Sequence, residues 1–193
     1  YDGGAQHIKG FKARLDQTLN RFAPSVDTFE RFKHSGLSTE IFSGGGTGTY
    51  SITRDPEENW LNAGAYRAQV HDKKTVGIVM AAGHHGRIHR DKYLKAGKPC
   101  PVVIIVGTDP VTYLAAGFTM PDSMPEYEWA GGLMDRPMEL IDGEVTGLPF
   151  PARSEIVMEG EISATETTLE GPFGEWHGYY AGDAQQEPLI RVK

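Results

Sequence analysis

Val102-Val103-Ile104-Ile105-Val106 is the stretch that decides the fold of this 193-residue chain. A continuous run of aliphatic residues with no polar alternation predicts a strand that is covered on both faces. Before this run, a period of two begins at residue 47 and predicts strands around residues 50–52, 65–70 and 75–80. After it, residues 155–162 alternate, with Ile156, Met158 and Ile162 on an expected buried face, and strand sequence resumes beyond residue 175.

Helix patterns separate these strands. Residues 85–96 form one predicted helix, ended by Gly97 and Pro99. Asp109 and Pro110 have the order of a helix cap followed by the first helical residue, so residues 110–117 predict a short helix. Residues 126–133 predict another. The sum is an α+β domain with a barrel or strongly bent sheet and helices packed outside it.

The first 46 residues have a different character. Apolar residues from Ile8 to Phe22 follow one helical stripe, which predicts a helix over residues 5–22. Ser25 is placed to cap a second helix that Gly36 ends. The glycine-rich stretch 44–48 lacks the Lys-Ser/Thr of a phosphate-binding loop, so we interpret it as a turn or loop. We therefore expect a helical N-terminal segment at residues 1–46 and a separate domain at residues 47–193.

Composition narrows the function classes. Hydrophobic residues make up 39% and charged residues 23% of the chain, as in ordinary globular proteins. A formal charge of −7 argues against nucleic acid or an anionic membrane as the main partner. The single Cys100 excludes a disulfide framework and is expected to be a core residue. No apolar run is long enough to span a bilayer, and the expected location is the cytoplasm. Because the chain starts at Tyr1 and ends in strand-like sequence, we expect a piece of a longer protein.

Two carboxylates, Glu170 and Glu175, flank a Gly-Pro-Phe-Gly turn. Neighbouring acids rarely titrate alike, and a nearby cation keeps one ionised while the other can carry a proton. Arg67 is the candidate cation. This arrangement suits a general acid or a proton relay. A surface loop that merely contains two glutamates is the alternative.

Asn62 and Arg67 flank a predicted strand start, with small residues between them that let a ligand approach the backbone. Strict alternation places the two side chains on opposite faces of one strand. Both can reach one site only if the strand starts between them or bulges. The alternative is a turn asparagine and an unrelated surface arginine.

A histidine cluster, His84, His85 and His89, is the chain's other candidate for metal chemistry. The zinc-protease motif is absent because Gly86 stands where its glutamate belongs. A mixed Asn/His/Glu set would instead suit Mn²⁺ or Mg²⁺. Structural histidines that cap a helix, or a zinc-dependent hydrolase that uses all three imidazoles, are the alternatives. Glu126 and Glu128 lie at a helix start, where the dipole favours acids without any function.

Taken in order, these pieces resemble the UbiD family of decarboxylases, which use prenylated flavin mononucleotide (prenylated FMN). The resemblance covers about residues 47–193. The matching stretches are Ile52-Thr53-Arg54-Asp55-Pro56-Glu57, Trp60 with Asn62 and Arg67, Gln69-Val70-His71-Asp72, Gly83-His84-His85, Glu126 and Glu128 with Ala130-Gly131, and Glu170-Gly171-Pro172-Phe173-Gly174-Glu175 with Gly178-Tyr179.

The resemblance implies a split β-barrel similar to that of flavin reductases. It also implies a divalent metal, usually Mn²⁺, that bridges to the cofactor phosphate and is held by Asn62, His85 and one acid of the Glu126/Glu128 pair, with Glu126 favoured. The Trp60 carbonyl would help to bind K⁺. The implied cofactor-binding residues are Asn62, Ala63, Gly64, Ala65, Tyr66, Arg67, His84, His85 and Glu126.

Arg67, Glu170 and Glu175 match the family's catalytic residues, with Glu175 as the proton donor. The implied activity is reversible decarboxylation of an aromatic or α,β-unsaturated carboxylic acid, with CO₂ as product or co-substrate and a flavin prenyltransferase as cofactor supplier. Chain length departs from the family because its C-terminal domain is absent, which suggests further domains or subunits. A non-catalytic scaffold is the alternative. His84 stands where many members have glutamine, so either His84 or His85 could be the ligand.

Overall fold

The computed structural model describes residues 49–121, 124–174, 179, 180 and 182–193, together with Asp27, Arg31 and His34. The chain divides into two compact units. One comprises Thr47–Gly171 and Ala184–Lys193, and it contains every named strand and helix of the described residues. The other comprises Tyr1–Gly46 and Pro172–Asp183.

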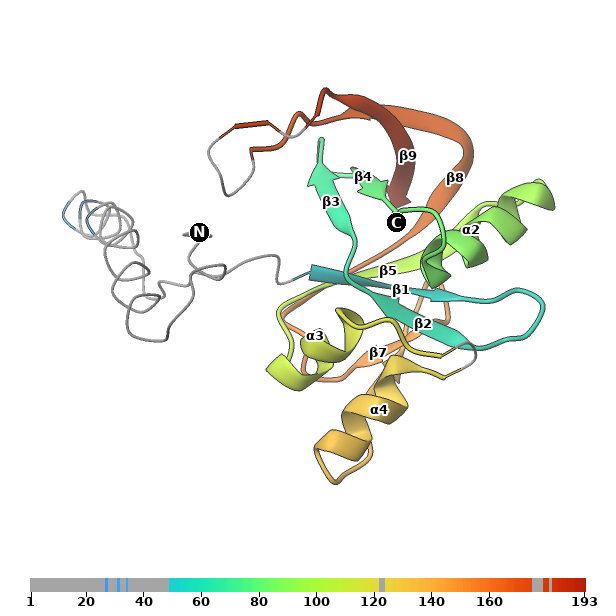
Figure 1. The fold of residues 1–193 in the computed structure, drawn as a ribbon, viewed down its shortest axis with the longest axis vertical. Helices are drawn as coiled ribbons and strands as arrows, with labels where there is room; N and C mark the ends of the chain where they lie inside the picture. The colour runs from blue at the N-terminus through green and yellow to red at the C-terminus, as the bar shows by residue number, and fades with distance from the viewer. Residues whose placement is uncertain are drawn as a thin grey trace. The chain divides into compact units, whose positions relative to one another are not determined.

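A seven-stranded sheet forms the larger unit, and all of its described pairings are antiparallel. Its order is β2-β1-β5-β8-β9-β4-β3 (Figure 1). The strands are β1 Thr49–Arg54, β2 Leu61–Gly64, β3 Arg67–Val70, β4 Thr75–Val79, β5 Cys100–Val106, β8 Ile156–Glu170 and β9 Gln185–Val192. A second sheet pairs β6 Leu140–Asp142 with β7 Pro149–Pro151.

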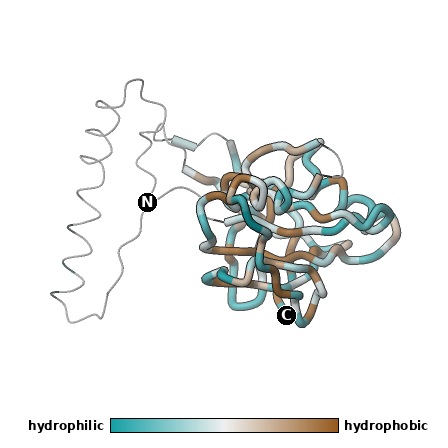
Figure 2. Tube along the Cα trace, turned by 90° about the horizontal axis from the view of Figure 1, so that it is seen from below, coloured by the Kyte–Doolittle hydropathy of each residue, from teal (hydrophilic) through white to brown (hydrophobic). Residues whose placement is uncertain are grey.

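β5 is the central element, as its aliphatic run predicts. It pairs with β1 on one side and β8 on the other, and its side chains alternate between two cores. Val102 and Ile104 pack with residues of β4, β8 and β9, whereas Val103 and Ile105 pack with β1 and two helices. Figure 2 shows hydrophobic segments running through this unit. Cys100 is buried in the first core, and burial raises the pKa of its thiol to about 12.

The sheet is curled. β2 and β3 occupy its opposite edges, yet only Ala65 and Tyr66 lie between them in the chain. The three steps from Gly64 to Arg67 span at most about 11 Å, so the two edges must approach each other at this point. Among the described residues β2 and β3 are not paired. The architecture is therefore α+β with a mainly antiparallel sheet, and a closed split barrel is not shown.

Three helices of the described residues cover the sheet. They are α2 His85–Lys95, α3 Pro110–Ala116 and α4 Glu126–Leu133, close to the predicted ranges. Figure 1 shows α2 on one side of β1 and β2, and α3 and α4 on the other. Gly97 follows α2 with φ 67°, a conformation that suits glycine at a helix end. The Asp109 carboxylate accepts hydrogen bonds from Val111 N and Thr112 N, so the predicted cap of α3 is confirmed.

Two strand predictions need correction. The predicted strand at residues 65–70 is shorter, because the chain leaves β2 at Gly64 and joins the opposite edge as β3 at Arg67. Ile156, expected on a buried face, is 54% exposed, because β8 starts beyond the edge of the core. Ile162 on the same predicted face is fully buried.

In the smaller unit, Asp27, Arg31 and His34 are helical, and Gly174 forms an antiparallel bridge with Tyr180. The predicted helix at residues 5–22, the caps at Ser25 and Gly36, and the glycine-rich stretch 44–48 lie outside the described residues, and the boundary at residue 46 stays a prediction. Within the described part of the chain, no helix is both long and apolar enough to cross a membrane.

Candidate functional site

A pocket of about 240 Å³ opens where β2 ends, α2 begins and α3 ends. It contains eight of the residues that the sequence predicts to bind cofactor or metal. The lining residues are Asn62, Ala63, Gly64, Ala65, Tyr66, Ala82, Gly83, His84, His85, Ala116, Gly117, Phe118, Thr119 and Glu126. Segments 62–66, 82–85 and 126 are distant in sequence, so the fold, rather than chain proximity, brings them together.

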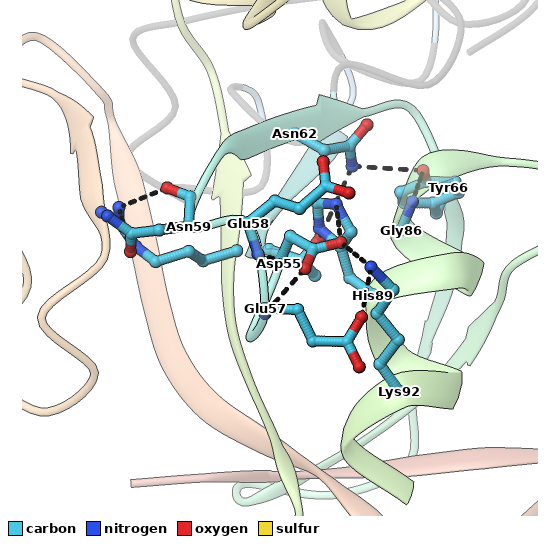
Figure 3. Close-up of polar contacts among 11 residues, drawn as sticks. Asp55, Glu57, Glu58, Asn59, Asn62, Tyr66, Gly86, His89 and Lys92 are labelled. Carbon is cyan, nitrogen blue, oxygen red and sulfur yellow. Dashed lines mark hydrogen bonds and ion pairs between the residues drawn. The ribbon is translucent and has the colours of Figure 1, made fainter. Parts of the chain in front are cut away.

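Asn62 lies on β2 and is 2% exposed. Its Nδ2 donates to Tyr66 Oη over 3.3 Å and to Thr53 Oγ1 over 3.5 Å, as Figure 3 shows in part. With the nitrogen directed to these two acceptors, Oδ1 is the end of the amide that remains for a ligand in the pocket.

Tyr66 closes one wall of the pocket and requires two glycines. An added Cβ at Gly64 would lie 2.4 Å from the Tyr66 ring, and one at Gly86 would lie 2.7 Å from it. Gly86 N also donates to Tyr66 Oη over 2.9 Å. Burial raises the pKa of Tyr66, so the hydroxyl keeps its proton at neutral pH. The first turn of α2 is thereby attached to the end of β2.

Glu126 is a buried acid at the start of α4, 3% exposed. Its Oε2 accepts a hydrogen bond from Ala63 N over 2.7 Å. Burial raises its pKa, while the Ala63 N–H, its own backbone N–H and nearby His85 act in the opposite direction. A carboxylate in this setting favours a cation beside it. Glu128, the alternative metal ligand, is exposed and is absent from the residues that line this pocket.

Behind the pocket lies a buried polar cluster (Figure 3). The rings of His85 and His89 both contact Trp60 edge-on, with centroid distances of 4.9 and 4.5 Å. His89 is fully buried, and burial lowers its pKa to about 4. The Trp60 carbonyl accepts a hydrogen bond from Asp55 N over 2.9 Å. One lone pair of this predicted K⁺ ligand is therefore already used within the turn that joins β1 and β2.

Arg67 and Glu170 form an ion pair between the start of β3 and the end of β8. Arg67 Nη2 lies 2.8 Å from Glu170 Oε2, and Nε lies 3.4 Å from Oε1, which is a bidentate arrangement. The Glu170 side chain is fully buried, whereas that of Arg67 is 49% exposed. Next to this pair, Gly171 N donates to Gln69 Oε1 over 3.0 Å, which joins the turn after β8 to β3.

The predicted residues thus fall into three groups. Asn62, His85 and Glu126 line one pocket with the backbone of residues 63–66. Arg67, the first residue of β3, directly follows the pocket residue Tyr66 in the chain, and it forms an ion pair with Glu170. Glu175 lies outside the described residues. The condition set by strand alternation is met, because the strand breaks at Ala65 and Tyr66, between Asn62 and Arg67.

The donor set fits a divalent metal of the Mn²⁺ or Mg²⁺ kind. It offers a buried carboxylate, an amide oxygen and an imidazole, which suit a hard or borderline ion. Among the described residues no group of three His, Cys, Asp or Glu side chains could hold a metal ion, and the predicted set contains only two such side chains besides Asn62. This finding is against the alternative zinc site of His84, His85 and His89. His84 is exposed at the pocket, while Nδ1 of His89 lies 3.0 Å from Thr53 Oγ1.

Several contributing residues were not predicted. Thr53 and Gly86 act on Asn62 and Tyr66 from neighbouring elements, and residues 116–119 supply one side of the pocket. For Thr53 the only available signal was its place inside a stretch that resembles the family, and Gly86 directly follows another such stretch, Gly83-His84-His85. The segment 116–119 follows α3 and carries no motif.

The comparisons with known proteins identify the family. Residues 46–193 match the UbiD model, described as the 3-octaprenyl-4-hydroxybenzoate carboxy-lyase Rift-related domain. The chain belongs to the UbiD family. It is 35% identical to a pyrrole-2-carboxylic acid decarboxylase of Pseudomonas aeruginosa over 147 residues, 76% of this chain and 30% of the relative. It is 37% identical to a phenolic acid decarboxylase of Bacillus subtilis over 146 residues, 74% of this chain and 31% of the relative.

Solved structures agree with this membership. The UbiD-class enzyme HmfF from Pelotomaculum thermopropionicum, in an evolved dimeric form in complex with prFMN, matches with a TM-score of 0.71 and 32% identity. That match covers 81% of this chain and 36% of the enzyme. Vanillic acid decarboxylase of Sedimentibacter hydroxybenzoicus in its closed form matches with a TM-score of 0.71 and 35% identity, covering 76% and 32%. The chain therefore spans about a third of the length of these relatives.

Proposed function

We propose that this chain is the cofactor- and metal-binding portion of a UbiD-type carboxy-lyase that acts on an aromatic or α,β-unsaturated carboxylic acid. The observation that carries the proposal is the pocket in which Asn62, His85 and Glu126 meet the backbone of residues 63–66. Family membership adds the reaction class, because the similar curated proteins are decarboxylases of pyrrole-2-carboxylic and phenolic acids. Reversibility, with CO₂ as co-substrate, belongs to the same proposal.

Prenylated FMN is the proposed cofactor, with Mn²⁺ held by Asn62 Oδ1, His85 and Glu126. A similar structure contains prFMN and another contains FMN. The small residues Ala63, Gly64 and Ala65 line the pocket at the end of β2, where the flavin phosphate is proposed to lie. A split barrel, which the family resemblance implies, is part of the same proposal. K⁺ at the Trp60 carbonyl is part of the same proposal, through the lone pair that Asp55 N does not use.

Arg67, Glu170 and Glu175 are proposed to carry the chemistry. When bound, the prenylated flavin supplies an electron sink for the charge left by departing CO₂. Glu170 is buried and pairs with Arg67 through both carboxylate oxygens, so its role is to orient the guanidinium rather than to donate a proton. The Arg67 side chain, which is half-exposed, is proposed to attract an anionic substrate. Glu175 then delivers the proton that replaces CO₂.

Further chain or a partner is proposed to complete the enzyme, because this chain spans about a third of its relatives. One of the similar Sedimentibacter hydroxybenzoicus structures, ShVdcCD, is described with a truncated ShVdcD, which supports a partner subunit as one source. A flavin prenyltransferase is the proposed supplier of the cofactor. A scaffold without activity is the outcome that would replace this proposal.

The experiment is co-expression of the chain with a flavin prenyltransferase, followed by native mass spectrometry, an absorption spectrum and a CO₂-release assay on a panel of aromatic acids. Bound prenylated FMN with Mn²⁺ is the expected result for the chain itself. When the completing chain or partner is supplied, CO₂ release should appear, and Glu175→Gln should lower it by roughly 100-fold or more. Glu175→Asp, which keeps an acid, is the matched control. Failure to retain either cofactor or metal would contradict the proposal, and full activity of Glu175→Gln would remove Glu175 from its role.

A further inference from the structure

A buried line of polar side chains runs from Asp55 through His89 and Thr53 to Asn62 (Figure 3). Asp55, His89 and Thr53 lie behind the pocket and are not among the residues that line it. All three are at most 2% exposed. Polar groups this deeply buried are costly unless they are paired, so their arrangement is informative about what they hold in place.

Asp55 is the fixed end of the line. Its Oδ1 accepts from Glu57 N over 2.8 Å and from Glu58 N over 3.0 Å, and Lys92 Nζ donates to its Oδ2 over 2.7 Å. The carboxylate therefore cannot turn without breaking these bonds. Its Oδ2 lies 3.7 Å from His89 Nε2. That distance exceeds a hydrogen bond, but the negative charge favours the ring tautomer with the proton on Nε2.

The tautomer of His89 determines the direction of the next contact. A neutral imidazole with its proton on Nε2 presents Nδ1 as an acceptor. Thr53 Oγ1 lies 3.0 Å from Nδ1, and in this tautomer the Thr53 hydroxyl donates its single proton to His89. Thr53 Oγ1 can then act only as an acceptor toward its other neighbour. That neighbour is Asn62 Nδ2, at 3.5 Å.

We propose that His89 and Thr53 are positioning residues that orient the Asn62 amide, with its oxygen toward the pocket and its nitrogen toward Thr53 and Tyr66. A flipped amide has nearly the same shape, but it would set Oδ1 against Thr53 Oγ1, an oxygen with no proton to give, so that only the Tyr66 hydroxyl could donate to it. It would also present an NH₂ group to the metal. This inference deepens the proposed function and rests on it, because it assumes that Asn62 Oδ1 is a metal ligand.

An orienting role of the Thr53 hydroxyl and a packing role of the Thr53 side chain lead to different results when residue 62 is changed. Aspartate at position 62 has two equivalent oxygens and therefore no orientation to set. If Thr53 only shaped the fold, its loss would weaken metal binding whether residue 62 is Asn or Asp. If Thr53 orients the amide, its loss matters only when residue 62 is Asn.

The experiment measures Mn²⁺ affinity by electron paramagnetic resonance titration of the chain, with thermal unfolding as the check on folding. Thr53→Val removes the hydroxyl at nearly constant shape, Thr53→Ala is a second deletion should the first not fold, and Thr53→Ser restores the hydroxyl. Ser51→Ala is the matched control, because Ser51 faces the same side of β1 and its buried hydroxyl has no hydrogen-bond partner within the described residues.

We expect Thr53→Val to weaken Mn²⁺ binding about 10-fold or more, the usual scale for a residue that supports a metal ligand. Thr53→Ser and Ser51→Ala should stay within about twofold of the parent on the same scale. In an Asn62→Asp background, Thr53→Val should add less than about a twofold loss. An equal loss in both backgrounds, or no loss in either, would overturn the orienting role while leaving the metal site intact. Absence of Mn²⁺ binding in the parent chain would overturn the metal site of the proposed function and this inference with it.

Discussion

The pocket of Asn62, His85 and Glu126 and the ion pair of Arg67 with Glu170 are two parts of one candidate site, built in opposite ways. The residues Asn62, His85 and Glu126 are at most 8% exposed. Asn62 and Glu126 are also held by hydrogen bonds to neighbouring side chains and backbone. The ion pair joins residues 103 positions apart, and its cation is half-exposed. A buried frame suits a metal that must stay, whereas a half-exposed guanidinium suits a substrate that must enter and leave.

Lowering the pH should have the largest effect on the pocket side of the site, measured as a loss in the free energy of unfolding. His89, behind the pocket, has a folded-state pKa of about 4 against 6.5 for an ordinary histidine. Its contribution to stability is complete above pH 6.5 and is lost as pH falls from 6.5 to about 4, because only the unfolded chain then takes up the proton. The loss should reach about 3 kcal/mol at most. Urea unfolding at pH 7, 6 and 5 measures the slope.

His89→Gln is the control for this prediction, since it removes the titrating group while keeping a polar side chain. The slope between pH 6.5 and 5 should flatten in that variant, because ordinary carboxyl groups titrate mainly below this range. An unchanged slope would show that another group causes the acid loss.

Replacing the predicted metal ligand should affect the pocket alone. His85→Ala is expected to weaken Mn²⁺ binding on the order of 100-fold, because an imidazole is lost from the coordination shell. His84→Ala is the matched control, since His84 is the exposed neighbour at the same pocket. Calorimetric titration with Mn²⁺ measures both. A larger loss in His84→Ala than in His85→Ala would exchange their roles.

The close approach around Tyr66 offers a test of the pocket wall without touching a ligand. In Gly86→Ala the new methyl group would fall 2.7 Å from the Tyr66 ring, so the ring or α2 must shift. We expect a loss of about 1 to 3 kcal/mol in the free energy of unfolding. Gly132→Ala, in α4, has open space around its Cβ and should be neutral or slightly stabilising. Equal stabilities of the two variants in urea unfolding would contradict the contact.

The ion pair should show the smallest effect. Arg67→Met leaves the buried Glu170 carboxylate without its guanidinium, which we expect to cost about 1 to 2 kcal/mol of unfolding free energy, reduced from the cost of a fully buried pair because Arg67 is half-exposed. The exposed pair of Arg191 with Glu166 is the control, and Arg191→Met should cost less unfolding free energy than Arg67→Met, because neither partner is buried. If the two variants lose the same amount, the burial of Glu170 has no energetic consequence.

Features with a local sequence signal could be predicted, whereas features that depend on contacts between distant parts of the chain could not. The aliphatic run of β5, the periodicity of α2 and the cap at Asp109 are local signals, and the structure confirms these elements. The UbiD resemblance, confirmed by the family match, named the pocket residues together. The break between β2 and β3 could not be predicted from the local sequence. It arises because the chain crosses there from one edge of a curled sheet to the other.

Long-range contacts mark the limit of sequence reasoning in this chain. Residues 163–170 carry mostly polar side chains, so the extension of β8 as far as Glu170 depends on pairing with β9. The contact of Gly86 with Tyr66 and that of Thr53 with His89 cross between elements that no periodicity connects. The burial of a threonine hydroxyl against an imidazole leaves no pattern in the sequence itself.

The proposed function depends above all on the pocket of Asn62, His85 and Glu126 holding Mn²⁺ together with the flavin phosphate. Native mass spectrometry of the chain co-expressed with a flavin prenyltransferase, compared with Glu126→Gln and with Glu128→Gln, tests it most directly. We expect one Mn²⁺ and one prenylated FMN in the parent and in Glu128→Gln, and loss of Mn²⁺ in Glu126→Gln. Equal Mn²⁺ content in Glu126→Gln and the parent would contradict it.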